Sequence, residues 1–138
     1  GPIEFNDAGW APDASVAFSV APPSPAGPPG GQGPQTPVRN VLAVLEDKSL
    51  PEDYEVRTFE GDIRVLHETW RYNFFASHGA FSPTQAGGNS RNDADAGIET
   101  RWSPVATEDA GSGPTTVWIV IRDGRGGETW AIRHAVAP

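Results

Sequence analysis

Residues 116–136 decide the fold class, and they read TVWIVIRDGRGGETWAIRHAV. On both sides of the glycine-rich segment 123–127, branched and aromatic side chains recur at every second position, which is the period of a β-strand. The glycines between the two runs can adopt positive φ angles without steric cost, and Asp123 is expected to accept hydrogen bonds from its own turn amides. The pattern therefore predicts a C-terminal β-hairpin.

A second alternating stretch lies upstream of this hairpin. It places Trp70, Tyr72 and Phe74 on one face of an extended chain and Arg71 and Asn73 on the other. Burying large aromatic side chains stabilises a fold by about 1.5–3 kcal/mol each. We therefore expect these residues to form a central strand whose aromatic face lies in the core.

Shorter runs with strand character occur at residues 15–20, 38–45, 54–59, 63–66 and 100–102. The third and fourth of these flank a short turn that contains glycine, which is typical of another hairpin. We find no segment longer than two turns with the period of a helix. Many short strands separated by Gly/Pro-rich turns indicate an all-β sandwich or barrel.

The N-terminal part has a different composition. Residues 21–37 read APPSPAGPPGGQGPQTP, with seven prolines and no charge, so neither a helix nor a sheet can form there. The segment is either a linker or a long loop within the domain. Residues 1–5 (GPIEF) look like a protease-cleavage and cloning remnant. The predicted organisation is thus a remnant at 1–5, a strand with a Pro/Gly-rich segment at 6–37 and the sandwich at 38–138.

The composition excludes several classes of function. The net charge is -8 and Lys48 is the single lysine, whereas binding to nucleic acid requires clustered basic residues. Cysteine is absent, which excludes disulfides and thiolate metal sites. No apolar run approaches the ~18 residues of a membrane span, so we expect no direct membrane insertion by this segment.

Catalytic signatures are also missing. No GxSxG elbow, Walker loop or GxGxxG motif follows a predicted strand. The three histidines, His67, His78 and His134, are far apart in the sequence and lack the spacing of a zinc site. We therefore expect a protein that is not an enzyme and has no cofactor.

One loop has the composition of a weak calcium site. Asn92, Asp93 and Asp95 present oxygen ligands at alternate positions, as calcium-binding loops do. The distal glutamate at the EF-hand spacing is missing, although Glu99 is near. A solvated acidic loop is the default interpretation, and these three residues are the candidate metal ligands.

Five tryptophans raise the alternative of a carbohydrate-binding platform. Trp70, Trp118 and Trp130 lie in strongly alternating strands, so at least some of them belong to the core. Trp10 and Trp102, in the N-terminal segment and near a loop, are the tryptophans that we expect to be exposed. They are the candidate binding residues.

Three blocks of the sequence resemble polycystic-kidney-disease-like (PKD-like) domains. Residues 70–82 (WRYNFFASHGAFS) are similar to the family's central aromatic strand and turn, residues 101–104 (RWSP) to a later strand, and residues 117–127 (VWIVIRDGRGG) to the last hairpin. The order agrees with the family from about Tyr54 to Val136. Two departures are the missing acidic "DPDGD"-like loop and the proline-rich insert after the first strand. The resemblance implies an immunoglobulin-like antiparallel β-sandwich without catalysis, as found in surface lipoproteins of Gram-negative bacteria.

We therefore expect a non-catalytic extracytoplasmic module for adhesion, scaffolding or protein interaction. It would lie at the bacterial cell surface or in the periplasm, anchored to the outer membrane through upstream sequence. The alternatives are a carbohydrate-binding module and a ligand-sensing ectodomain. The expected partner is a protein or a cell-surface polysaccharide.

Overall fold

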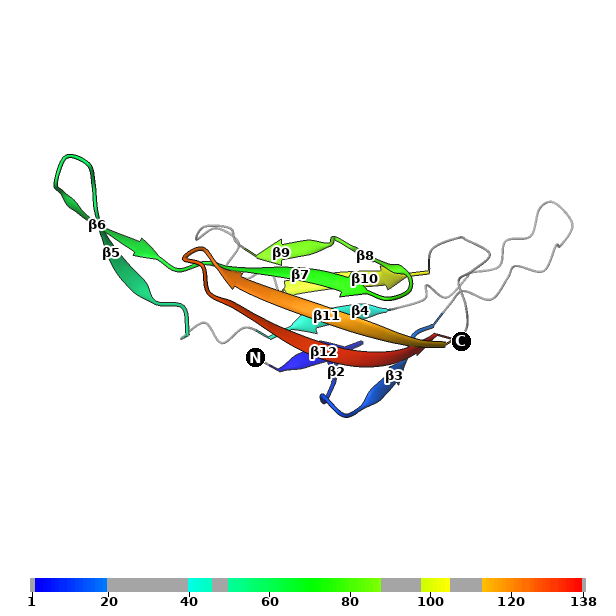
Figure 1. Ribbon diagram of the computed structural model, residues 1–138. Helices are drawn as coiled ribbons and strands as arrows, with labels where there is room; N and C mark the ends of the chain where they lie inside the picture. The colour runs from blue at the N-terminus through cyan, green and yellow to red at the C-terminus, as the bar shows by residue number, and fades with distance from the viewer. Residues whose placement is uncertain (1, 20–39, 46–49, 88–97, 105–112, 138) are drawn as a thin grey trace, which may run out of the picture.

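The computed structural model describes residues 2–19, 40–45, 50–87, 98–104 and 113–137. Within these ranges all regular secondary structure is β-strand (Figure 1). No described segment forms a helix long and apolar enough to cross a membrane. The predicted all-β class is confirmed.

The first sheet has five short antiparallel strands in the order β2-β1-β4-β10-β8. Its strands are β1 Ile3–Phe5, β2 Ala8–Gly9, β4 Val41–Val44, β8 Ala80–Ser82 and β10 Ile98–Ser103.

The second sheet contains the longest strands and has the order β3-β12-β11-β7-β9. Its strands are β3 Ser15–Ala17, β7 Trp70–Ala76, β9 Gln85–Gly87, β11 Gly113–Asp123 and β12 Glu128–Ala137. β11 and β12 form the predicted C-terminal hairpin, with Val120 opposite Trp130. β7 pairs with β11 on one side and β9 on the other, and β3 runs parallel to β12.

The two sheets share one hydrophobic core. Tyr72 and Phe74 of β7 are buried as predicted, and the ring of Phe74 lies 6.0 Å from that of Phe81 in the first sheet. Val117 and Ile119 of β11 complete this part of the core and are fully buried. Two facing sheets with a common core are consistent with a sandwich.

The N-terminal residues belong to this core, which corrects the predicted boundaries. Residues 3–5, set aside as a cloning remnant, form β1 and pair with β4. The alternation in this strand buries Ile3 and Phe5 and leaves Glu4 between them partly exposed. Phe18 is also buried and lies 5.3 Å from the ring of Phe5. The sandwich therefore begins at residue 3 and not at residue 38, while residues 21–37 lie outside the described ranges.

The predicted hairpin around Gly61 is confirmed, but it lies outside both sheets. Its strands are β5 Asp53–Arg57 and β6 Ile63–His67, which form a separate two-stranded sheet. Figure 1 shows this hairpin projecting from one end of the sandwich. We call residues 53–67 the arm.

Candidate binding surface

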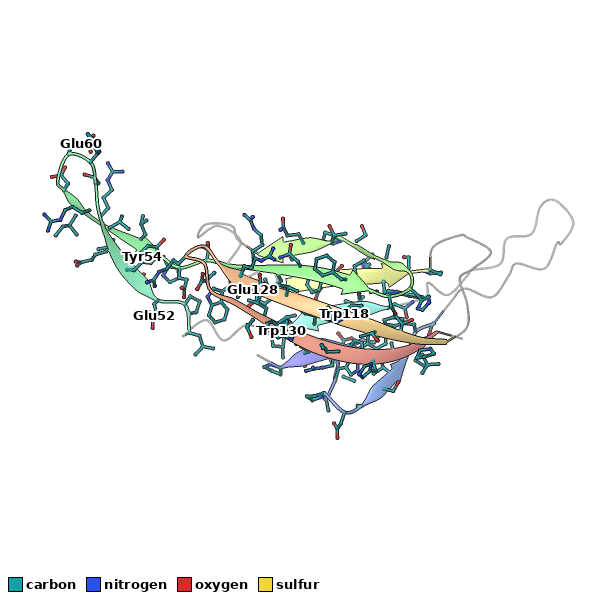
Figure 2. All side chains as sticks on the ribbon, in the orientation of Figure 1. Glu52, Tyr54, Glu60, Trp118, Glu128 and Trp130 are labelled. Carbon is teal, nitrogen blue, oxygen red and sulfur yellow. The ribbon has the colours of Figure 1, made fainter. Side chains whose placement is uncertain are left out.

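The outer face of the second sheet carries a row of apolar side chains across three strands. In the middle strand, Trp118 lies opposite Phe75 of β7 and opposite Ile132 of β12. Val120 lies opposite Trp130. Residues directly opposite each other in a sheet share a face, and the intervening residues of β11 point into the core, so all five side chains point outward. We call these five residues the aromatic face; Figure 2 labels both of its indoles.

Three of these side chains are exposed although they are large and apolar, and Trp118 and Val120 between them are half-buried. Trp130 is 65% exposed, Phe75 53% and Ile132 40%. Single exposed apolar residues are common and need no explanation. A contiguous patch on neighbouring strands is different, because such patches mark interaction surfaces in soluble proteins.

One end of the aromatic face carries two arginines on neighbouring strands. Arg71 of β7 lies directly opposite Arg122 of β11, and like charges in this position destabilise a sheet. The Nε of Arg122 is 2.5 Å from Oε2 of Glu128, whereas Arg71 has no acidic partner within the part of the chain that the structure describes. A shallow open depression at this end is lined by these three residues, Asp123 and Gln85, among others. Arg71 is therefore the group at this end that can meet an anionic side chain.

The turn between β11 and β12 holds its shape through Asp123. The carboxylate of Asp123 accepts hydrogen bonds from the amides of Arg125 (2.9 Å) and Gly127 (2.6 Å), as predicted for this turn. These two bonds, Arg125 first, lower the pKa of Asp123 below its usual value. The turn also contacts the arm, because the guanidinium of Arg125 lies 4.7 Å from the centre of the Tyr54 ring.

The base of the arm is tied to the sandwich at Glu68. Its Oε2 accepts a hydrogen bond from the indole nitrogen of Trp70 (3.2 Å), and its amide donates to the carbonyl of Glu52 (2.8 Å). Oε1 of Glu68 is 3.9 Å from Nη1 of Arg125. The arm is thus fixed at its base, next to the β11–β12 turn.

The rest of the arm exposes apolar side chains to solvent. Phe59 at the tip is fully exposed, and Ile63, Val65 and Leu66 are all more than one-third exposed. Ile63 and Val65 lie on one face of the ribbon and Leu66 lies on the other, opposite Tyr54. An isolated two-stranded hairpin is only marginally stable in water. The arm is therefore a second candidate contact surface, because docking on a partner would bury its apolar side chains.

The two tryptophans predicted to be exposed are buried, so that prediction is wrong. Trp10 is 2% exposed and its Nε1 donates to the carbonyl of Ala14 (3.2 Å). Trp102 is 4% exposed, its Nε1 donates to the carbonyl of His78 (2.8 Å), and its ring stacks on Phe18 at 4.3 Å. Neither indole is accessible to a sugar. The exposed tryptophan is Trp130.

The candidate calcium ligands Asn92, Asp93 and Asp95 lie outside the described residues. Among the residues that are described, no group of three or more His, Asp or Glu side chains could hold a metal ion. The arm holds one His–Asp pair, in which Nδ1 of His67 lies 2.7 Å from Oδ1 of Asp53. Both side chains of this pair are largely solvent-exposed, and surface pairs of this kind contribute little to stability.

Comparisons with protein-family models, with curated proteins and with solved structures found no match. The functional argument therefore depends on the aromatic face, the arm and the charged end between them.

Proposed function

We propose that this chain is a non-catalytic protein-interaction module whose contact surface is the aromatic face. The observation that carries the proposal is the exposure of Trp130 and Ile132 on β12 and of Phe75 on β7, the two strands that flank β11. Protein interfaces are enriched in aromatic residues and arginine and depleted in lysine. The aromatic face has this composition, because two tryptophans and a phenylalanine adjoin Arg71 and Arg122.

The strand order supports the immunoglobulin-like kind of sandwich. Immunoglobulin-like domains place strands A, B, E and D in one sheet and strands C, F and G in the other. The order β1-β4-β10-β8 corresponds to A-B-E-D, and β7-β11-β12 corresponds to C-F-G. The arm then takes the place of the B–C connection, and residues 123–127 take that of the F–G turn.

This correspondence also supports binding at the end that carries the arm. In variable domains, the B–C and F–G loops lie at one end and form part of the binding site. Here the contact between Arg125 and Tyr54 joins the F–G turn to the arm. The aromatic face begins beside this end, where Arg122 precedes the turn and Glu128 follows it.

The proposal includes the cellular location and the type of parent protein that the sequence predicts. The module would be an adhesion or scaffold domain of the PKD-like kind in an exported bacterial surface lipoprotein. A signal sequence followed by a lipobox cysteine in the complete gene would support this location. A gene without an export signal would contradict it.

Site-specific photo-crosslinking in the cells that make the protein tests the interaction. A photoreactive residue at position 132 is expected to form an adduct with a partner, whereas the same residue at position 101 is not. Arg101 is a matched control because it is exposed on β10 of the opposite sheet. A partner identified in this way should then bind the purified chain directly.

The strength of that binding gives the second readout. Trp130→Ser is expected to weaken it by about 30-fold or more, since central tryptophans contribute about 2 kcal/mol or more to interfaces. Arg101→Ser should leave the affinity unchanged. Equal labelling from positions 132 and 101, or binding that is insensitive to Trp130→Ser, would contradict the proposal.

Carbohydrate binding is the second candidate, and the exposed indole of Trp130 beside Trp118 favours it. Flat aromatic rings on a sheet can stack on sugar rings. The aliphatic side chains of Val120 and Ile132 offer no ring for stacking, which is why a protein partner is preferred. Retention on an insoluble polysaccharide that is lost in Trp130→Ala would support sugar binding, and no retention of the parent chain would remove it.

A further inference from the structure

We propose that the arm of one copy of this chain docks on the aromatic face of a second copy, so that copies join head to tail. The inference rests on the proposed function, for which it names the partner. Three observations carry it: the arm and the face both expose apolar side chains, the acidic tip of the arm complements Arg71 at one end of the face, and the arm cannot reach the face of its own copy.

The first observation concerns apolar surface. Phe59, Ile63 and Val65 are at least half exposed on a ribbon to which no other strand pairs within the described part of the chain. Trp130 and Phe75 are at least half exposed on the sandwich. Docking one surface on the other would remove both from water in a single contact, and this burial would drive association.

The second observation concerns charge. The arm carries four carboxylates and two guanidinium groups, which leaves a net charge of two negative. Two of the carboxylates, Glu60 and Asp62, follow Phe59 at the tip. At the end of the aromatic face, Arg71 has no acidic partner among the described residues, whereas Arg122 opposite it is paired with Glu128. Complementary charges of this kind set the orientation of a complex and speed its formation.

The third observation concerns reach. Figure 1 shows the arm projecting away from the sandwich, and the contacts of Glu68 and Arg125 fix its base in this direction. The arm therefore cannot fold back onto its own second sheet without breaking these contacts. An extended strand advances about 3.3 Å per residue, so the five-residue strands of the arm span roughly 17 Å. Neighbouring strands of a sheet lie about 5 Å apart. The arm is therefore long enough to cross three strands of the aromatic face of another copy.

In the head-to-tail arrangement each arm docks on the face of the next copy, so the contact is heterologous. Heterologous contacts continue from copy to copy unless a ring closes. An open assembly keeps one free face at one end and one free arm at the other. The expected species are therefore short chains whose mean length grows with concentration.

Sedimentation velocity of the full chain at increasing concentration tests the proposal. The parent chain should show oligomers larger than a dimer. Phe59→Asp, in the arm, and Trp130→Ser, in the face, should each give monomers. Arg101→Ser, on the opposite sheet, should behave like the parent. All three side chains are exposed, and unchanged circular dichroism and melting temperature would verify that each variant folds.

A mixture of the two monomeric variants provides the sharpest readout. The Phe59→Asp copy keeps an intact face, and the Trp130→Ser copy keeps an intact arm. An equimolar mixture should therefore form a one-to-one dimer and nothing larger. Failure of the mixture to associate would overturn the proposal, as would a parent that stays monomeric up to a concentration of roughly 1 mM.

These outcomes separate the inference from the proposed function. A monomeric parent whose position 132 still cross-links to a different protein would overturn self-docking and leave the interaction module standing. A monomeric parent with no adduct at position 132 would overturn both. Parent dimers that persist in Phe59→Asp would also overturn the inference, because they would need a contact that does not involve the arm.

Discussion

Replacing Gly79 by alanine should destabilise the sandwich far more than a surface substitution usually does. Gly79 has a φ of +74°, in the left-handed region that L-residues avoid. A Cβ built at this position would overlap three atoms of the Trp102 indole. The indole has no room to move, since it stacks on Phe18 and donates a hydrogen bond to the carbonyl of His78.

The magnitude follows from two contributions. The left-handed conformation costs an alanine about 1–2 kcal/mol. An extra methyl group in a packed site costs a further ~1–3 kcal/mol. We therefore expect Gly79→Ala to lower the free energy of unfolding by about 2–5 kcal/mol, a large part of the 5–15 kcal/mol that is typical of a domain.

Urea unfolding followed by circular dichroism measures this change, and two other glycines separate the contributions. Gly126 has a φ of +102° and Gly124 does not have a positive φ; neither has an atom within 4 Å of a built Cβ. Gly126→Ala should therefore show the backbone cost alone, and Gly124→Ala should stay within about 0.5 kcal/mol of the parent.

A double-mutant cycle isolates the overlap. In a Trp102→Leu background the indole is gone, so Gly79→Ala should cost no more than Gly126→Ala does. The reasoning is refuted if Gly79→Ala in the parent chain is no more destabilising than Gly126→Ala. It is equally refuted if removing the indole leaves the cost of Gly79→Ala unchanged.

Three further predictions concern the core, the aromatic face and the turn. Phe18→Ala should lower the free energy of unfolding by about 3–5 kcal/mol, because Phe18 is 1% exposed and contacts several aromatic rings; a loss below about 1 kcal/mol in urea unfolding would show that the N-terminal segment is not part of the core. Trp130→Thr should change stability by less than about 1 kcal/mol, the scale of a cross-strand pair, and a larger loss would mean that its indole serves folding. The lowered pKa of Asp123 means that its carboxylate stabilises the fold above the unfolded pKa of about 3.9, and that this contribution is lost as the pH falls from there through the folded value. Asp123→Asn should remove that part of the acid sensitivity, which urea unfolding between about pH 6 and pH 2.5 would measure; a pH profile identical to that of the parent would contradict the assignment.

The regular strands could be predicted from the sequence because their alternation is strong and local. β7 alternates aromatic with polar residues, which identifies both the strand and its buried face. β11 alternates differently, with Val117 and Ile119 on one face and Trp118 and Val120 on the other. Because both faces of this strand are apolar, alternation alone does not indicate which one the opposite sheet covers. The aromatic face was missed for this reason, although two apolar faces on one strand could have signalled it.

Other features depend on partners that are distant in sequence. Trp102 is buried because Phe18, from the other end of the chain, packs against it, and no local pattern predicts that contact. Residues 1–5 look like a cloning remnant in the sequence, and the three-residue strand β1 shows itself only through its pairing with β4. The arm was predicted as a hairpin, but its position outside the sheets follows from the way β4 and β7 are placed in different sheets.

The parallel pairing of β3 with β12 gives the domain a defined response to tension. Residues 15–17 run alongside residues 134–136 in the same direction. Force applied between residue 10 and residue 137 would pull the two strands past each other, so their hydrogen bonds would be stretched all at once and not opened one by one. β3 would thereby resist the extraction of β12 under tension. In single-molecule pulling, a Val16→Pro variant has no amide to donate to the ladder and should unfold at a lower force than the parent.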